Sequence, residues 1–263
     1  MISISTFVGI LGAISLFAYA ILQSTDNYLI FVSLFSLVIV LGGSFGATLI
    51  SYSFRLIWAA FAEMMVNLLD EKNQNKQLKQ LVNRIIEWND IYKKQGITAL
   101  ENSLTEKEKK DDFIINAMEL LGTGYKSKDL AGMLDDTNES DFQRRSEHVN
   151  VINTLATYAP SFGMVGTLIG LIIMLDNMTG DLAALGKGLA IALLTTLYGT
   201  LLAQLLFKPS AIRIARRQHR IFFERQIITA GLQLITENKD NLYIQDRLNC
   251  YLAPKHKMTE LGK

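Results

Sequence analysis

The stretch TLATYAPSFGMVGTLIGLIIML, residues 154–175, contains no charged side chain. After a short connection, Asp176–Asp181, the chain continues with LAALGKGLAIALLTTLYGTLLAQLLF, residues 182–207, in which Lys187 is the one charged residue. A helix needs about 20 mostly apolar residues to cross the hydrocarbon core of a bilayer. Both stretches meet that length, so together they predict a transmembrane hairpin.

Another hairpin is predicted at the start of the chain, with spans at residues 6–22 and 29–50. The first 54 residues hold one charged side chain, Asp26, although 19% of the whole chain is charged. Such gaps exclude an ordinary soluble domain, a disordered chain and a nucleic-acid-binding protein. Ala18–Ala20 resembles a signal-peptidase site, but no basic residue precedes the apolar run, so we expect the first span to be retained.

The basic residues predict the orientation of the spans. Apart from Lys187, all Lys and Arg residues fall in Arg55–Arg145 or from Lys208 onward, and the short connections 23–28 and 176–181 have none. Loops rich in Lys and Arg stay on the cytoplasmic side of a membrane. We therefore expect both termini and the large middle region in the cytoplasm.

The cytoplasmic parts are predicted to be helical, since no alternating strand pattern occurs in them. Apolar periodicity and capping residues mark the expected helices. These helices are 54–70, as a continuation of the second span, then 77–92, then 113–121 after Asp111 or Asp112, a helix from Asp141 into the third span, and a helix after Pro209.

The predicted fold is an all-α membrane protein with four transmembrane helices. A large helical cytoplasmic insert lies between the second and third spans, and a cytoplasmic helix ends the chain. We expect the cytoplasmic helices to extend the membrane bundle rather than to form a separate domain. The expected parts are a first hairpin at 1–53, the insert at 54–152, a second hairpin at 153–208, and a C-terminal helix and tail at 209–263.

Small residues recur at helical spacing in the third and fourth spans. Lipid gives little hydrophobic drive between helices, so close backbone approach at small residues supplies the packing. We therefore interpret one face of each span as a helix-packing seam. Its residues are Gly163, Gly166 and Gly170 in the third span and Gly188, Ala192, Gly199 and Ala203 in the fourth.

Three threonines and two prolines give these spans a second interpretation. The hydroxyls of Thr167, Thr195 and Thr196 could line a path for a partly dehydrated cation, because hard cations prefer oxygen ligands. Alternatively, each hydroxyl bonds to a carbonyl one turn earlier in its own helix. Pro160 and Pro209 cannot donate to the preceding turn, and they are either fixed bends or hinges coupled to the cytoplasmic helices.

Apart from Lys187, the spans contain no Asp, Glu, Lys, Arg or His. Such groups mark ion relays and substrate paths, so their absence argues against a self-contained pump or proton channel. Lys187 either snorkels to the outer interface or acts where ions arrive. The three histidines lack metal-ligand spacing with one another or with the single cysteine, Cys250, and no phosphate loop or nucleophile elbow occurs. We expect neither an enzyme nor a bound metal or cofactor.

Two motifs resemble a known family. They are YAPSFGMVGTLIG at 158–170, and LGKGLAIALLTTLYG at 185–199, which FKP follows at 207–209. They resemble the last two spans of flagellar stator A subunits of the MotA/PomA type, within the wider MotA/TolQ/ExbB proton channel family. The four-span layout, the insert and the length are similar too. In the insert, KKQGITALE resembles the stretch that contacts the flagellar rotor, with Lys93 where an Arg is usual and Glu101 at the acidic position.

The resemblance implies a homo-oligomer, a pentamer, around two copies of a single-span B subunit of the MotB/PomB type in the bacterial inner membrane. The B subunit would supply the ion-binding aspartate, and a rotor switch-complex protein would be the cytoplasmic partner. Thr167 and Thr196 match positions that face the ion site, and Pro160 and Pro209 match the prolines to which coupling is assigned. The transported ion is Na⁺ or H⁺; a Thr at position 167 resembles sodium-type members and favours sodium.

Other functions stay open. A related complex could energise a non-flagellar machine in envelope transduction, gliding or defence, although ExbB/TolQ proteins resemble a three-span arrangement. An autonomous cation channel is disfavoured by spans without carboxylates. A membrane scaffold without ion passage would explain the small-residue seam equally well.

Overall fold

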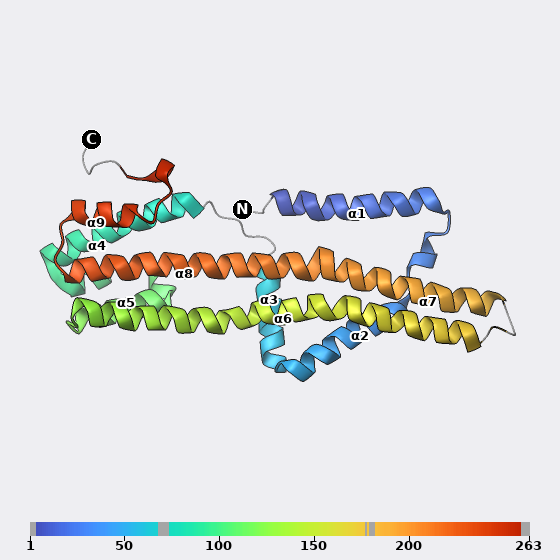
Figure 1. The fold of residues 1–263 in the computed structure, drawn as a ribbon. Coiled ribbons are helices and arrows are strands. Elements are labelled where there is room, and N and C mark those ends of the chain that lie inside the picture. Colours follow the sequence, from blue (N-terminus) through green and yellow to red (C-terminus); the bar gives the residue numbers. More distant parts are fainter. Residues whose placement is uncertain (1–3, 68–73, 177, 179–181, 259–263) are drawn as a thin grey trace. The chain divides into compact units, whose positions relative to one another are not determined.

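The computed structural model describes residues 4–67, 74–176, 178 and 182–258, and these residues form helices and turns without a strand (Figure 1). The predicted all-α class is therefore confirmed for this part of the chain. The helices in chain order are α1 (Ile4–Ser24), η1 (Tyr28–Phe31), α2 (Leu34–Ser51), α3 (Phe54–Asn67), α4 (Gln74–Asn102), η2 (Glu108–Lys110), α5 (Asp112–Gly122), α6 (Ser127–Asp176), α7 (Leu182–Leu201), η3 (Leu202–Phe207), α8 (Lys208–Thr236), α9 (Asn241–Asn249) and η4 (Pro254–His256).

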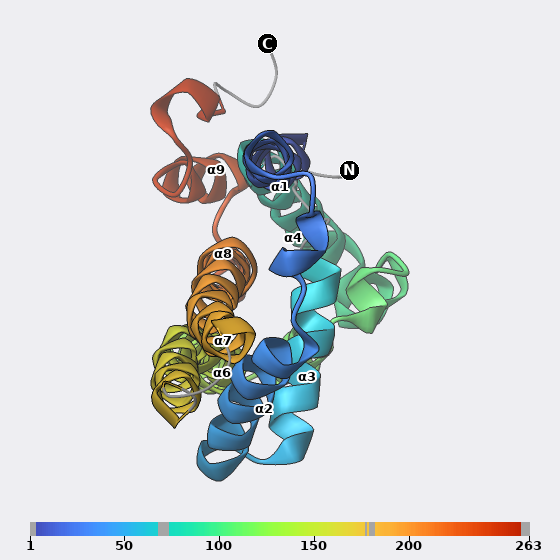
Figure 2. The ribbon, with the colours of Figure 1, turned by 90° about the vertical axis from the view of Figure 1, so that its right-hand side faces the viewer.

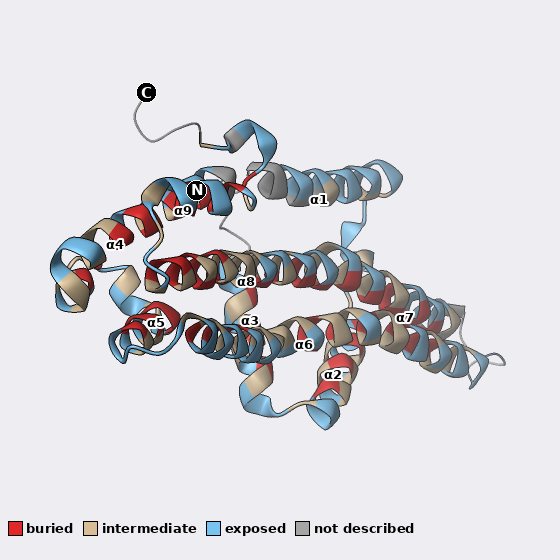
Figure 3. Ribbon diagram, turned by 60° about the vertical axis from the view of Figure 1, so that its left-hand side comes forward, coloured by how far each residue is buried: buried red, intermediate tan, exposed pale blue. Residues whose placement is uncertain are grey.

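Three helical segments are long and apolar enough to cross a membrane, namely Tyr28–Ser51, Ser127–Asp176 and Leu185–Thr236. They contain most of the predicted second, third and fourth spans. In α1 the qualifying apolar stretch is the shorter Leu11–Ser24. Figure 3 shows α1 largely exposed, and Leu16 is 69% accessible. Apolar side chains exposed along a helix fit a lipid surrounding better than an aqueous one. Part of the predicted connection Asp176–Asp181 lies outside the described residues.

The chain folds into two compact units, each assembled from separate parts of the sequence. Unit 1 combines residues 1–71 and 146–216, and unit 2 combines residues 72–145 and 217–263. Helices α6 and α8 contribute residues to both. Unit 2 has a hydrophobic core of its own.

In unit 1, α2 packs beside α7 (Figure 2). The helix begins after Ser33, whose hydroxyl accepts a hydrogen bond from the backbone N–H of Ser36. Its buried residues recur every four positions, close to the helical period of 3.6 residues. Side-chain hydroxyls on this face donate to carbonyls one turn earlier, so they can be buried without an unpaired donor. The buried residues of α2 are Ser36, Val40, Ser44 and Thr48.

Helix α3 does not continue α2, so the prediction that 54–70 extends the second span was wrong. Tyr52 ends α2 in an extended conformation, with φ −135° and ψ 151°. Figure 2 shows the two helices running in different directions on either side of this break. One face of α3 then packs into the core of unit 1. That core contains Val40, Ile57, Ala60, Met64, Val151, Ile152, Leu155, Ala159, Ala203, Phe207, Ala211 and Ile214.

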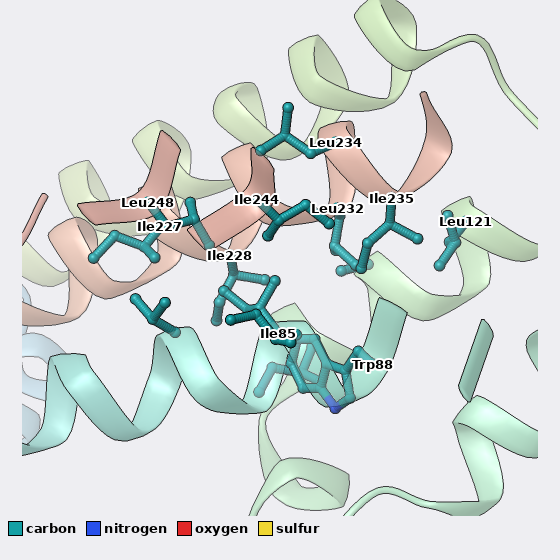
Figure 4. Packing of buried hydrophobic residues seen from close by; sticks show 14 of the residues in the cluster. Ile85, Trp88, Leu121, Ile227, Ile228, Leu232, Leu234, Ile235, Ile244 and Leu248 are labelled. Carbon is teal, nitrogen blue, oxygen red and sulfur yellow. The ribbon is translucent and has the colours of Figure 1, made fainter. Parts of the chain in front are cut away.

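Unit 2 packs around Trp88, which is fully buried on α4 (Figure 4). Side chains of α5, α8 and α9 surround it, and α4 packs beside α9. The helix α4 is broken at Gly96, with φ 79° and ψ −174°, near the predicted end of the 77–92 helix. The predicted cap of the 113–121 helix is also found, because the Asp111 carboxylate accepts from the N–H of Phe113.

Candidate ion path and helix seam

Glycines bring α6 and α7 into backbone contact within unit 1. A methyl carbon at Gly163 would lie 2.9 Å from the carbonyl oxygen of Thr195, and one at Gly166 would lie 2.5 Å from the Thr195 side chain. At Gly170 the same carbon would lie 2.6 Å from the backbone nitrogen of Ala192, and at Gly188 it would lie 2.8 Å from the carbonyl oxygen of Gly170. The small residues of the predicted seam therefore lie where the two helices approach most closely.

The seam continues to the prolines. A methyl carbon at Gly199 would lie 2.5 Å from the carbonyl oxygen of Ala159 and 3.2 Å from the Cα of Pro160. Helix α6 stays helical through Pro160. Ala203 is 1% exposed in the core of unit 1, and it lies on η3, a π-helical turn that directly precedes α8 and Pro209. A π turn widens the helix, and such turns often occur where the regular ladder is interrupted.

The three threonines have different surroundings. Thr195 is fully buried, and its hydroxyl donates to the carbonyls of Ile191 and Ala192 in its own helix. Thr167 is partly exposed and donates to the Met164 carbonyl, 2.5 Å away. A hydroxyl that donates in this way keeps its lone pairs for another group. The Thr167 oxygen therefore keeps its lone pairs at a partly exposed position, whereas the Thr195 hydroxyl is fully buried.

Thr196 differs from Thr167 and Thr195 because its hydroxyl forms a hydrogen bond between the two helices. Its hydroxyl donates to the carbonyl of Gly163 on α6 at 3.4 Å, and its side chain is partly exposed. Thr167, Thr195 and Thr196 are thus all placed on or beside the seam.

The seam supplies oxygen atoms but no carboxylate. In the described part of α2, α7 and η3, and from His148 to Leu175 of α6, no Asp or Glu occurs. Among all described residues, no group of three or more His, Cys, Asp and Glu side chains could hold a metal ion.

One contact between a histidine and a carboxylate in unit 1 was not anticipated. The Nδ1 atom of His148 lies 2.5 Å from a carboxylate oxygen of Glu63, which joins α6 to α3. Both side chains are mostly buried, with 23% and 17% exposure respectively. The pair is 85 positions apart in sequence, so no local spacing could have revealed it.

The two expected rotor-contact residues lie on α4 in unit 2, on either side of the break at Gly96. The ammonium of Lys93 donates to the carbonyl of Lys239 at 2.8 Å and lies 3.7 Å from the carboxylate of Asp240. Glu101, in contrast, is exposed. The structure therefore ties Lys93 to the turn between α8 and α9, and leaves the Glu101 carboxylate accessible.

Arg225 on α8 joins three helical segments of unit 2, and its role was not predicted. It is 4% exposed, and its guanidinium donates to Asp141 on α6 at 2.7 Å and to Asp111 before α5 at 3.1 Å. It also lies over the ring of Phe113, 4.7 Å from the centroid. Burial opposes ionisation of Asp141, but hydrogen bonds from Arg225 and Arg144 outweigh it and lower the pKa of that carboxyl.

Comparison with known proteins finds a family match. Residues 105–227, which include all of α7 and the seam face of α6, match the MotA/TolQ/ExbB proton channel family. This segment is similar to the MotA/TolQ/ExbB proton channel family. Since this is a family of ion channels and not of enzymes, the prediction that the chain is no enzyme is confirmed.

Two proteins of known name match almost the whole chain. The chemotaxis protein PomA of Vibrio alginolyticus is 28% identical over 262 residues, covering 99% of each chain. Motility protein A of Cereibacter sphaeroides is 29% identical over 255 residues, covering 97% of each. The similarity therefore includes the first hairpin and unit 2 as well as the segment that the family model matches.

Solved MotAB structures have the same fold as this chain. The structure of C. jejuni MotAB matches with a TM-score of 0.83 and 21% identity, over 98% of this chain and 100% of the other. The flagellar MotAB stator complex from Bacillus subtilis matches with a TM-score of 0.80 and 21% identity, over 96% of each chain. At this level of identity the match establishes the fold alone.

Proposed function

We propose that the chain is the A subunit of a flagellar stator, which converts an ion gradient into torque on the rotor. One observation carries this function: the spans pack through a glycine seam beside threonine oxygens, yet they contain no carboxylate. A channel-like pair of helices that lacks a carboxylate can obtain one from a partner. Near full-length similarity to PomA and to motility protein A supports the same function.

The proposed topology has four spans, with both termini in the cytoplasm of a bacterial inner membrane. Three candidate spans and the apolar helix α1 support four crossings. The confinement of Lys and Arg to the long segments supports the orientation. Unit 2, which holds most of the insert, would then face the cytoplasm.

The proposed partners are further copies of this chain and a single-span protein. Five copies would surround two single-span B subunits, as the family resemblance implies. The similar structures from C. jejuni and Bacillus subtilis are MotAB complexes, which supports association with a MotB-type protein. Each B subunit would bring one intramembrane aspartate to the seam between α6 and α7.

In the proposed mechanism, the cation passes from the outer side to the partner's aspartate and leaves to the cytoplasm. The Thr167 and Thr196 oxygens would replace part of the water shell of the cation, which favours sodium as the hard cation. Pro160 and η3 before Pro209 would let the inner ends of the helices move as the carboxylate loses and regains its ion. Lys93 and Glu101 would transmit that movement to the rotor switch-complex protein.

Deletion of the gene from its own organism tests the function. We expect intact flagella that do not rotate, and recovery of swimming when the chain and its single-span partner are supplied together. Replacing sodium by potassium in the medium should stop the recovered cells. If the deleted strain swam normally while envelope transport, gliding or a defence response failed, the flagellar assignment would be wrong. Robust ion flux through liposomes that contain the purified chain alone would instead indicate an autonomous channel.

A further inference from the structure

A cavity of about 650 Å³ opens in unit 1 between α7 and the junction of η1 with α2. Its wall is mostly apolar, and Lys187 contributes the one charged group among the residues that line it. Several of its apolar side chains are more than half exposed, among them Leu29 at 67% and Val32 at 74%. The lining residues are Leu29, Ile30, Val32, Ser33, Phe35, Ile173, Lys187, Ala190, Ile191 and Leu194.

The cavity uses a face of α7 that the seam does not use. Lys187, Ala190, Ile191 and Leu194 follow the spacing i, i+3, i+4, i+7, so they form one stripe of the helix. Gly188, which contacts α6, points away from this stripe because successive residues turn by about 100° around a helix. The ammonium of Lys187 therefore belongs to the cavity and not to the seam between α6 and α7.

Hydrogen bonds of Tyr198 hold the wall of the cavity in place. Its hydroxyl donates to the carbonyl of Phe31 at 2.5 Å and accepts from the N–H of Ser33 at 2.9 Å. These bonds fix the end of η1 and the first residue before α2 against α7. A cavity whose wall is fixed in this way is preformed, which is typical of ligand sites.

The chemistry of the cavity changes along α7. Over the described residues, the structure gives Lys187 neither a hydrogen bond nor an ion pair. From Lys187 to Leu194 the helix rises by about 10 Å, within the roughly 15 Å of one bilayer leaflet. One end of the cavity thus offers a cation, and the rest offers an apolar slot.

We propose that this cavity binds an anionic glycerophospholipid, with its phosphate paired to Lys187 and one acyl chain along Ala190 and Leu194. The placement of Lys187 at the outer headgroup level rests on the proposed topology, whereas the binding itself does not. Charge complementarity selects this occupant. Helix α1 of a second copy would fill the slot with apolar side chains, but Ile4–Ser24 has no acidic residue and would leave the ammonium unpaired.

Native mass spectrometry of the full-length chain, purified in neutral detergent and supplied with phosphatidylglycerol or phosphatidylcholine, tests the proposal. We expect wild-type protein to retain one phosphatidylglycerol per chain. Lys187→Met keeps the apolar stem and removes the charge, so it should weaken retention of phosphatidylglycerol about fivefold and leave phosphatidylcholine unchanged. Ala190→Phe should fill the slot and reduce retention of both lipids, whereas Leu193→Phe, outside the lining residues, should match wild type.

Three results would overturn the lipid site. These are equal retention of phosphatidylglycerol by wild type and Lys187→Met, displacement of the bound anion by excess inorganic phosphate, and photocrosslinking of position 190 to a second copy of the chain instead of to lipid. The measurement needs neither the single-span partner nor motility. A failure here would therefore leave the stator function standing, and a failure of the stator function would leave this site testable.

Discussion

Gly170 and Ala192 approach so closely that a methyl carbon at Gly170 would lie 2.6 Å from the Ala192 backbone nitrogen. Backbone atoms cannot move aside as the end of a flexible side chain can, so a larger residue at this position would push α6 and α7 apart. The same holds for Gly188, where the nearest atoms are the Gly170 carbonyl oxygen and the Met174 backbone nitrogen, both at 2.8 Å. The two helices can therefore approach this closely only with a small residue at each of these positions.

Gly188→Ala should destabilise the pairing of α6 with α7 by about 2 kcal/mol through overpacking. Gly186→Ala, two residues earlier on the same helix, is the matched control, because nothing lies within 4 Å of the added methyl carbon. Thermal unfolding of the purified chain in detergent measures both. Equal unfolding midpoints for the two variants would show that α6 and α7 do not approach this closely at Gly188.

Thr167→Ala should weaken the use of sodium without weakening assembly. The Thr167 hydroxyl donates within its own helix and is not part of the backbone contact, so its loss leaves the seam intact. Loss of one oxygen ligand costs roughly 1 kcal/mol, which raises the sodium concentration for half-maximal swimming speed about fivefold. Swimming speed against sodium concentration gives the result, with membrane protein levels as the control. An unchanged, sodium-independent speed would contradict the sodium assignment.

Local sequence features predicted the long helices and the seam because they depend on residues close together in the chain. The uncharged stretches 154–175 and 182–207 give the required apolar length, and most of each lies in an observed candidate span. The cap of α5 followed from Asp111 in the same way. Glycine spacing identified the contacting faces, since a helix repeats every 3.6 residues.

The features that the sequence did not predict depend on contacts between residues far apart in the chain. The break at Tyr52 has no Gly or Pro to mark it, and the Tyr52 hydroxyl instead lies 3.3 Å from that of Thr154 on α6. The bonds of Tyr198 to Phe31 and of Arg225 to Asp111 join residues 167 and 114 positions apart. No periodic pattern encodes such pairs. The direction of α3 and the contacts of Arg225 in unit 2 could therefore be found only from the structure.

Lys93 and Glu101 should respond differently to neutral substitution. Lys93→Gln removes the positive charge and shortens the side chain by one atom, which weakens the hydrogen bond to the Lys239 carbonyl, so it should cost roughly 1 kcal/mol of stability in addition to any loss of rotation. Glu101→Gln changes an exposed carboxylate and should impair rotation with an unchanged unfolding midpoint. Swimming assays and thermal unfolding of both variants separate the two effects. A Lys93→Gln protein that unfolds like wild type would show that the α8–α9 turn does not hold this lysine.

Asp141→Asn should destabilise unit 2 at neutral pH and lose that effect in acid. The substitution removes a charged hydrogen bond to buried Arg225, which is worth roughly 2 kcal/mol. Because the folded chain lowers the pKa of Asp141, the stabilisation is complete above the ordinary Asp value of about 4 and is lost as the pH falls below it toward the folded pKa. The unfolding free energies of wild type and variant should therefore differ from pH 7 down to about pH 5 and converge in stronger acid.

Asp136→Asn, which changes an exposed carboxylate on the same helix, is the control. Urea unfolding of the purified chain at a series of pH values measures the difference, and a gap that stayed constant into strong acid would exclude the Arg225–Asp141 contact as its source.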